Sequence, residues 1–249
     1  MDELALLVSL HKDNKRQGPG SDEHTRLALQ LSGLTERSNR LRIADIGCGT
    51  GASTLVLASE LDADITAVDL FPEFLDTLQK NAIATGLGRR IHSLNCSMDA
   101  LPFEPNSLDA IWSEGAIYNI GFETGIKTFK PFLKSGGILA VSEITWLTQN
   151  RPEALTQHWH SEYPDIALAS EKSQILENNG FILKGYFPLP KSCWTTHYYE
   201  PLQHRFQDFL NENPDKKATD IIEAEKHEMA LYDQYHNYYS YGFYIAEKQ

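Results

Sequence analysis

Short runs of aliphatic and β-branched residues recur along the chain and alternate with longer stretches in which hydrophobic residues have helical spacing. This alternation is typical of an α/β fold in which a mostly parallel sheet is covered by helices on both faces. The runs predict seven strands, at residues 41–46, 65–69, 91–96, 108–113, 137–144, 181–187 and 241–247. A doubly wound sheet is therefore expected.

Hydrophobic spacing predicts helices between the strands at residues 51–61, 72–85, 121–133 and 171–179. Two further helices, at 4–12 and 22–31, are expected before the first strand. The turn-rich segment 17–21 lies between these two helices. Two interpretations of it stay open: a connector before a helix capped by Ser21, or a segment that folds over a ligand.

Residues 191–239 separate the last two expected strands, where a doubly wound fold needs only a short connection. Their hydrophobic spacing and many aromatic residues predict a helical insertion. One interpretation is a lid, in which Trp194, Thr195, His197, Tyr198 and Tyr199 close over a cleft and exclude water. The other is a self-association surface of tyrosines at positions 235, 238 and 239, which would make the protein a homodimer.

The chain of 249 residues, 41% of them hydrophobic, is long enough to bury a sizeable core in a single domain. We expect a core of about residues 41–188 and 240–249, with the insertion at about 190–239. The formal charge of −12 disfavours a nucleic-acid partner. No hydrophobic run approaches the ~20 residues of a membrane span, and the first residues are acidic, so a cytoplasmic protein without a membrane partner is expected.

Cysteine and histidine spacing gives no sign of a metal site. The cysteines, Cys48, Cys96 and Cys193, are odd in number, lie far apart and form no Cys-x-x-Cys pair, which suits a reducing compartment. The histidines match no zinc signature. No metal is therefore expected.

A glycine-rich turn joins the first strand to a helix in the sequence Leu-Arg-Ile-Ala-Asp-Ile-Gly-Cys-Gly-Thr-Gly, residues 41–51. Glycines let the backbone approach a ligand closely, so this turn is a predicted cofactor site. Gly47, Gly49 and Ala52 also satisfy the dinucleotide fingerprint, and Asp69 follows about twenty residues later, where its carboxylate can bind ribose hydroxyls. Asp45 favours a cationic ligand, because a carboxylate at the mouth of the loop would repel a pyrophosphate.

The segment Asp45-Ile46-Gly47-Cys48-Gly49-Thr50-Gly51 resembles the first motif of class I S-adenosylmethionine-dependent methyltransferases, and Asp69 matches the ribose-binding acid of that family. Residues 99–103, 107–112 and 133–139 resemble the small-molecule branch that includes quinone-biosynthesis methyltransferases, so the resemblance covers about residues 42–144. It implies a Rossmann-like, mostly parallel seven-stranded sheet with an antiparallel last strand. It also implies S-adenosylmethionine as cofactor, S-adenosylhomocysteine as product and a small-molecule methyl acceptor.

The resemblance also implies where the cofactor lies, between the glycine loop and the ends of the second and third strands. Relatives often carry an acidic residue where this chain has Ser97, so the adenine contacts are assigned to Met98 and Asp99. The alternative is that Asp99 begins a solvent-exposed turn and Met98 belongs to the core. The predicted cofactor-binding residues are Asp45, Gly47, Cys48, Gly49, Gly51, Asp69, Leu70, Ser97, Met98, Asp99 and Glu114.

Residues just after the fourth strand are expected to face the methyl acceptor, because ligands of such sheets bind at the carboxyl ends of the strands. Glu114 is a candidate base or partner of a cationic acceptor, unless it is a surface carboxylate. Tyr118, together with Asn119, is a candidate for orienting the acceptor, and His197 is a candidate base from the insertion. Positioning alone can lower a barrier by up to ~7–11 kcal/mol, so the reaction does not require a strong base.

Three residues after the fifth strand, Glu143, Thr145 and Trp146, are candidates for the same cleft, and Trp146 is equally typical of a core. Two other functional classes stay open. An NAD-dependent oxidoreductase shares the glycine fingerprint, but the chain has no recognisable Tyr-x-x-x-Lys pair. A non-catalytic protein would keep the cofactor loop and use the helical insertion as an interaction surface.

Overall fold

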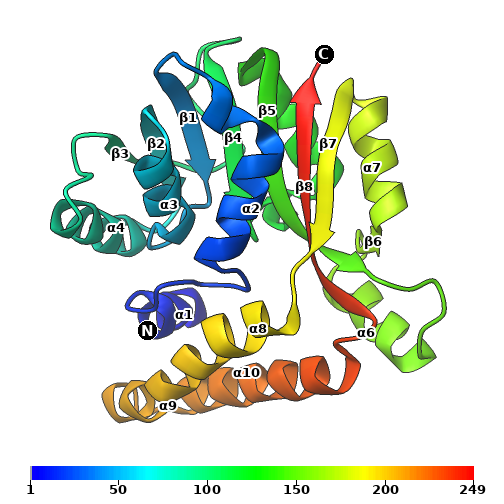
Figure 1. Cartoon of the computed structure of the whole chain (residues 1–249). Coiled ribbons are helices and arrows are strands. Elements are labelled where there is room, and N and C mark those ends of the chain that lie inside the picture. Colours follow the sequence, from blue (N-terminus) through cyan, green and yellow to red (C-terminus); the bar gives the residue numbers. More distant parts are fainter. Residues whose placement is uncertain (1) are drawn as a thin grey trace.

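The computed structural model describes residues 2–249. Its sheet has eight strands, in the order β3-β2-β1-β4-β5-β8-β7 with β6 paired to β5. The strands are β1 Leu41–Ile46, β2 Ala63–Asp69, β3 Ile91–Asn95, β4 Leu108–Glu114, β5 Leu133–Trp146, β6 Ala167–Leu168, β7 Phe181–Pro188 and β8 Tyr239–Lys248. β8 runs antiparallel to both β5 and β7, whereas the other pairings are parallel (Figure 1).

The helices are α1 Glu3–His11, α2 Asp22–Ser32, α3 Ala52–Glu60, α4 Pro72–Ala84, α5 Phe122–Phe129, α6 Glu153–Glu162, α7 Ala169–Asn178, α8 Lys191–Trp194, α9 Glu200–Glu212 and α10 Lys216–Tyr235. A π-helical turn, Thr195–Tyr199, links α8 to α9. The expected Rossmann-like fold is confirmed, including the antiparallel last strand. Two elements were not predicted: β6, which makes an eighth strand, and α6, which buries only Leu155 and therefore shows no helical hydrophobic pattern.

Both faces of the sheet are buried, which explains why its strands are nearly continuous hydrophobic runs. Along β1, Ile43 packs into the core formed with α2, α3 and α4. Its neighbours Ala44 and Ile46 pack into the opposite core, which α5 and α7 cover. The period of two along a strand therefore places consecutive residues in two different cores.

A third core lies at the carboxyl ends of the parallel strands, where α1, α8, α9 and α10 cross beneath the sheet (Figure 1). Trp194 stacks on Tyr232 with the ring centroids 4.2 Å apart, and both side chains are buried. Residues 191–235 are thus helical almost throughout, as the sequence predicted.

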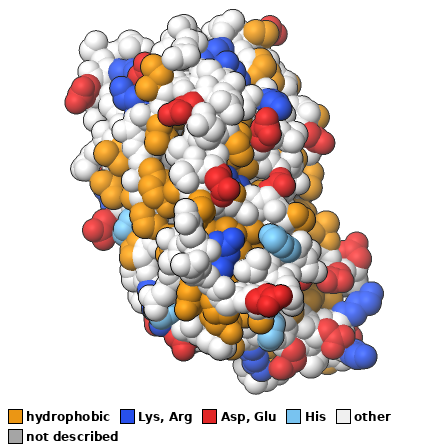
Figure 2. All heavy atoms as spheres, turned by 90° about the vertical axis from the view of Figure 1, so that its right-hand side faces the viewer, with side chains coloured by type: hydrophobic (Ala, Val, Ile, Leu, Met, Phe, Trp, Pro, Cys, Tyr) orange, Lys and Arg blue, Asp and Glu red, His pale blue; other side chains and the backbone are white. Residues whose placement is uncertain are grey.

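The face of the molecule in Figure 2 carries acidic and basic side chains interspersed with hydrophobic ones. Among residues 2–249, no helix is both long enough and apolar enough to cross a membrane.

Candidate functional site

A cavity of about 720 Å³ opens at the carboxyl ends of β1, β2 and β4. One part of its wall comes from the loop between β1 and α3 and from the residues that follow β2 and β3. The other part comes from α1, from residues 16–19 and from the segment after β4. The cavity thus joins the predicted cofactor loop to an N-terminal wall.

Glycine is required at two positions of the cofactor loop that line the cavity. Gly47 and Gly49 line the cavity together with Cys48 and have positive φ angles of 71° and 54°. A Cβ atom on Gly47 would collide with the side chain of Ala116, which follows β4. The loop therefore packs against the neighbouring segment more closely than a side chain would allow.

The backbone N–H groups of this loop are already hydrogen bonded within the protein. The N–H groups of Gly47 and Cys48 both donate to Val68 O, at 2.8 and 3.0 Å. The N–H of Gly49 donates to Asp69 Oδ2 at 2.8 Å, and that of Thr50 donates to Gln17 Oε1 at 2.9 Å. The N–H of Gly51 donates to Cys48 O at 2.9 Å. Dinucleotide-binding loops instead direct free N–H groups at a pyrophosphate. The loop is therefore poorly suited to a dinucleotide.

The structure corrects the placement of Asp45 and Gly51. Asp45 lies fully buried behind the loop rather than at its mouth, where its Oδ2 accepts hydrogen bonds from Ser53 (2.8 Å) and Thr54 (2.6 Å). This burial raises the pKa of Asp45 to about 7. Gly51 is not part of the cavity wall either, and a Cβ atom there would collide with Leu78 of α4.

Asp69, at the end of β2, lines the cavity and supports the loop. Its Oδ2 accepts the N–H of Gly49 at 2.8 Å, and its Oδ1 accepts the N–H of Phe71 at 3.0 Å. Burial raises the pKa of Asp69. Each carboxylate oxygen has a second lone pair, so Asp69 can still accept hydrogen bonds from a ligand. Leu70 lies beside it on the wall and is exposed.

Ser97, Met98 and Asp99 lie after β3 on the same side of the cavity as Asp69 and Leu70, at the position expected for the adenine contacts. Met98 also packs against the core beneath α5. The structure therefore brings these residues to the cofactor loop, while their individual contacts stay a prediction.

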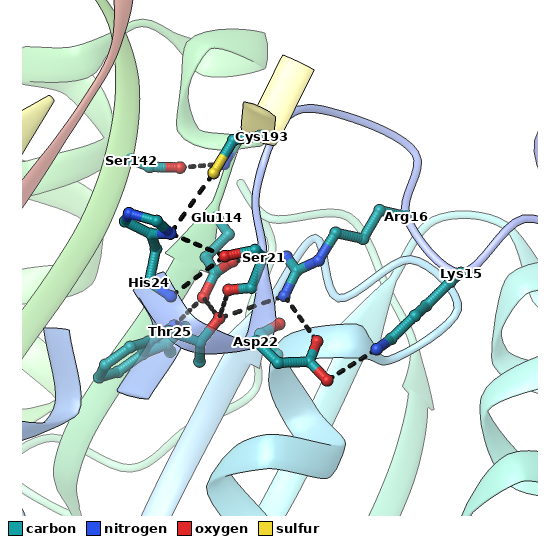
Figure 3. Close-up of polar contacts among 12 residues, drawn as sticks. Lys15, Arg16, Ser21, Asp22, His24, Thr25, Glu114, Ser142 and Cys193 are labelled. Atoms are coloured by element: carbon teal, nitrogen blue, oxygen red, sulfur yellow. Dashed lines mark hydrogen bonds and ion pairs between the residues drawn. The ribbon is translucent and has the colours of Figure 1, made fainter. Parts of the chain in front are cut away.

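Glu114, at the end of β4, is held by three donors. Its Oε1 accepts hydrogen bonds from Thr25 (2.7 Å) and Trp112 (2.9 Å), and its Oε2 accepts one from Arg16 at 2.8 Å (Figure 3). The Arg16 and Glu114 side chains are 7% and 9% exposed. Because both oxygens are engaged, the geometry does not support Glu114 as a general base.

The other catalytic candidates are placed differently. Tyr118 lines the cavity beside Asn119 and is 40% exposed, and desolvation by the surrounding wall raises the pKa of its hydroxyl, which keeps it neutral. His197 is exposed and borders a separate, smaller hollow of about 190 Å³. The structure therefore removes His197 from the cavity and leaves Tyr118 there.

Most residues of the expected lid and of the segment after the fifth expected strand do not reach the cavity. Of the expected lid, only Tyr198 reaches the cavity wall. Glu143, Thr145 and Trp146 are buried but do not line the cavity. Instead, Oε1 of Glu143 lies 3.1 Å from Nζ of Lys172.

Most of the N-terminal wall was not predicted from the sequence, although a segment that folds over a ligand was one of the two interpretations of residues 17–21. It consists of Leu4, Leu7, Val8 and His11 of α1, followed by residues 16–19. The sequence did contain a signal: α1 is hydrophobic almost all round, which indicates a helix covered on both sides. Its remaining leucines pack into the third core while this face borders the cavity.

Comparison with known proteins agrees with this geometry. A family model described as "Methyltransferase domain" matches residues 43–137. An S-adenosylmethionine-dependent methyltransferase from Geobacter sulfurreducens, solved in complex with S-adenosyl-L-homocysteine, has the same fold: the TM-score is 0.84 at 16% identity, over 98% of each chain. Residues 43–137 thus match the methyltransferase-domain model, and the whole chain has the fold of an S-adenosylmethionine-dependent methyltransferase.

The chain is 26% identical to the chloroplastic tocopherol O-methyltransferase of Arabidopsis thaliana over 186 residues, which are 73% of this chain and 49% of that protein. The matched segments span between 27% and 55% of the first three curated relatives. The [4+2]-cyclase SpnF shares the fold, with a TM-score of 0.77 at 20% identity over 98% of this chain and 92% of that chain. The resemblance to the quinone-biosynthesis branch stays a prediction.

Proposed function

We propose that this protein transfers the methyl group of S-adenosylmethionine to a small-molecule acceptor and releases S-adenosylhomocysteine. The observation that carries the proposal is a cavity of about 720 Å³ that joins the glycine loop to the apolar wall of α1. This volume lies within the range of enclosed small-molecule sites, roughly 300–1,000 Å³.

The residues of the cavity fit the proposed cofactor. The bound cofactor supplies a methyl group activated by its sulfonium charge, and Asp69, Asp99 and Glu114 give the wall an acidic character that favours a cation. Asp69 can accept from ribose hydroxyls, and Met98 and Asp99 can contact the adenine. The hydrogen-bonded loop N–H groups disfavour the pyrophosphate of NAD.

The acceptor end favours a molecule with an apolar body. Leu4, Leu7 and Val8 line it, and Tyr118 and Tyr198 add aromatic rings. Arg16 is the only lysine or arginine among the described residues of the cavity wall, and it is already paired with an acid. A highly charged acceptor such as a phosphate ester would meet only this one lysine or arginine among the described residues of the wall.

Positioning, rather than a strong base, accounts for catalysis in this site. The Tyr118 hydroxyl and the Asn119 amide can hydrogen bond to the attacking group of the acceptor and orient it. The apolar side chains of α1 exclude water from the reacting atoms. The open acceptor end also speaks against a non-catalytic scaffold, for which we would expect a cleft filled by side chains.

Calorimetric titration with S-adenosylhomocysteine and with NAD tests the cofactor assignment without a known acceptor. We expect binding of the first and no heat with NAD. Asp69→Ala should weaken S-adenosylhomocysteine binding by about 1–3 kcal/mol, because ribose hydroxyls lose an acceptor and the loop loses a support. Asp76→Ala, an exposed carboxylate on α4, is the matched control and should bind as the wild type does. Wild-type affinity in Asp69→Ala would refute the site.

A further inference from the structure

Aromatic rings line the acceptor end of the cavity together with the apolar face of α1. The wall residues of α1 recur three and four positions apart, so a single face of the helix borders the cavity: Leu4, Leu7, Val8 and His11. The tyrosines at positions 118 and 198 line the same end. The ring of Tyr198 is stacked against that of His11, with the centroids 6.2 Å apart and an angle of 19° between the planes. The acceptor therefore meets a surface that is both apolar and aromatic.

Two carboxylates of α10 lie behind this aromatic surface. Oε1 of Glu225, whose side chain is 12% exposed, lies 3.5 Å from Nε2 of His11. Oε1 of the half-buried Glu228 accepts a hydrogen bond from the hydroxyl of Tyr199 at 2.9 Å, directly beside Tyr198 in the chain. Within residues 2–249, neither acid forms an ion pair with a lysine or an arginine. The acceptor end is thus backed by negative charge that no lysine or arginine neutralises.

The field of these acids reaches the cavity wall. Desolvation is the largest cause that raises the pKa of Tyr118 and of Tyr198, and the charge of Glu228 raises both further. Burial, followed by the charge of Glu225, raises the pKa of Glu228 itself to about 7. Two partly buried like charges repel one another, and a nearby cation would offset that cost. A positively charged ligand in the acceptor end would supply this cation.

We propose that the methyl acceptor is a basic amine with an apolar body, whose nitrogen binds beside the rings of Tyr118 and Tyr198; this rests on the proposed function. Aromatic rings attract a cation through the negative charge of their faces, and the acids behind these rings add to the attraction. The apolar body of such an amine can pack on the leucines of α1. An anionic acceptor would instead be repelled by Glu225 and Glu228.

Methylation of a nitrogen atom agrees with a site that lacks a strong base. The neutral amine attacks the methyl carbon with its lone pair, and the carbon–sulfur bond breaks with its electron pair going to sulfur. Positive charge thus passes from sulfur to nitrogen, and an N–H proton of the product ammonium is released to water afterwards. The rings and acids of the acceptor end stabilise this charge as it develops on nitrogen, and such stabilisation in the transition state accelerates the reaction.

The charge of the methylated product tests the class of the acceptor. Purified protein would be incubated with methyl-labelled S-adenosylmethionine and a low-mass extract of the cells that naturally make it. After unreacted S-adenosylmethionine has been removed by chromatography, the labelled product would be analysed by electrophoresis at pH 7. We expect migration towards the cathode, because a basic amine is protonated at this pH. A labelled product that is neutral or anionic at pH 7 would overturn the proposal.

Glu228→Gln tests the charge behind the wall. The amide oxygen of glutamine can still accept from Tyr199, so the substitution removes the charge and keeps the hydrogen bond. At pH 8, where Glu228 is ionised, the initial rate of labelling at limiting extract should fall roughly 3- to 10-fold, the effect of one partly screened charge. Glu228→Asp keeps the charge and should recover most of the rate. Glu223→Gln, an exposed acid of the same helix, is the matched control and should label as the wild type does.

Calorimetry with S-adenosylhomocysteine shows whether each variant is folded, and its affinity should not change. An unchanged labelling rate in Glu228→Gln, or equal losses in Glu228→Gln and Glu228→Asp, would overturn the role of the charge. If Glu228→Gln does not fold, Glu225→Gln removes the neighbouring charge and should show the same loss, and an unchanged rate there would overturn the role as well. If the wild type labels no low-mass compound, the proposed function itself fails, whereas a neutral labelled product refutes the amine alone.

Discussion

Asp45 should make the protein less stable as pH rises, in contrast to most aspartates. Its carboxyl is fully buried, Oδ1 has no hydrogen-bond partner among the described residues, and burial raises its pKa from 3.8 to about 7. The folded state therefore prefers the protonated acid. Stability from this preference is fully present below the unfolded pKa and is lost as pH rises through the folded pKa.

The magnitude follows from the two pKa values. With pKa values of 3.8 and about 7, the ionisation of Asp45 lowers the free energy of unfolding by about 2–3 kcal/mol between about pH 5 and pH 8. Asp45→Asn removes the titration, and its side-chain oxygen can still accept from Ser53 and Thr54. The unfolding free energy of the variant, relative to wild type, should therefore rise by about 2–3 kcal/mol over this pH range.

Urea unfolding at both pH values measures this difference directly. Asp64→Asn is the matched control, because Asp64 is exposed and Arg40 lowers its pKa, so it stays ionised throughout the range. Its difference from wild type should not change with pH. A difference for Asp45→Asn that is constant or falls from pH 5 to pH 8 would refute the reasoning.

Two further substitutions test the packing of the site and of the sheet. Gly47→Ala should lower the free energy of unfolding in urea by about 2–4 kcal/mol, because the added Cβ atom would collide with Ala116 and the backbone has a positive φ. Gly136→Ala is the control, because Gly136 has the same φ of 71° but open space around it, and it should cost only about 1 kcal/mol. Equal costs would contradict this account. Lys172→Met should lower the free energy of unfolding by about 3–5 kcal/mol in the same assay, because it leaves Glu143 buried and unpaired. Adding Glu143→Gln should recover much of this loss. No recovery would argue against the ion pair.

The predictable part of this fold came from local patterns. The strands were found because hydrophobic runs such as 41–46 are buried on both faces, and the cofactor loop was found because Gly47 and Gly49 are needed for its backbone angles. Helix α2 begins where expected because Ser21 caps it, accepting the N–H of His24 at 3.2 Å. Each of these signals depends on residues close together in the sequence.

What was missed depends on contacts across the chain. Asp45 precedes the loop glycines in the sequence, but whether its side chain faces the ligand or the core is decided by Ser53 and Thr54 of the next helix. Arg16 and Glu114 are 98 residues apart, so their pairing at the cavity has no local pattern. The role of α1 as a wall likewise depends on the helices of the insertion that hold it in place.

The most direct test of the central claim is the fate of a radiolabelled methyl group. Purified protein would be incubated with methyl-labelled S-adenosylmethionine and an extract of the cells that naturally make it, and the products separated by size and by solubility in organic solvent. Our account predicts label in a low-mass, organic-soluble product, and little of it with Asp69→Ala. Label in the macromolecular fraction, or label that does not depend on Asp69, would contradict it.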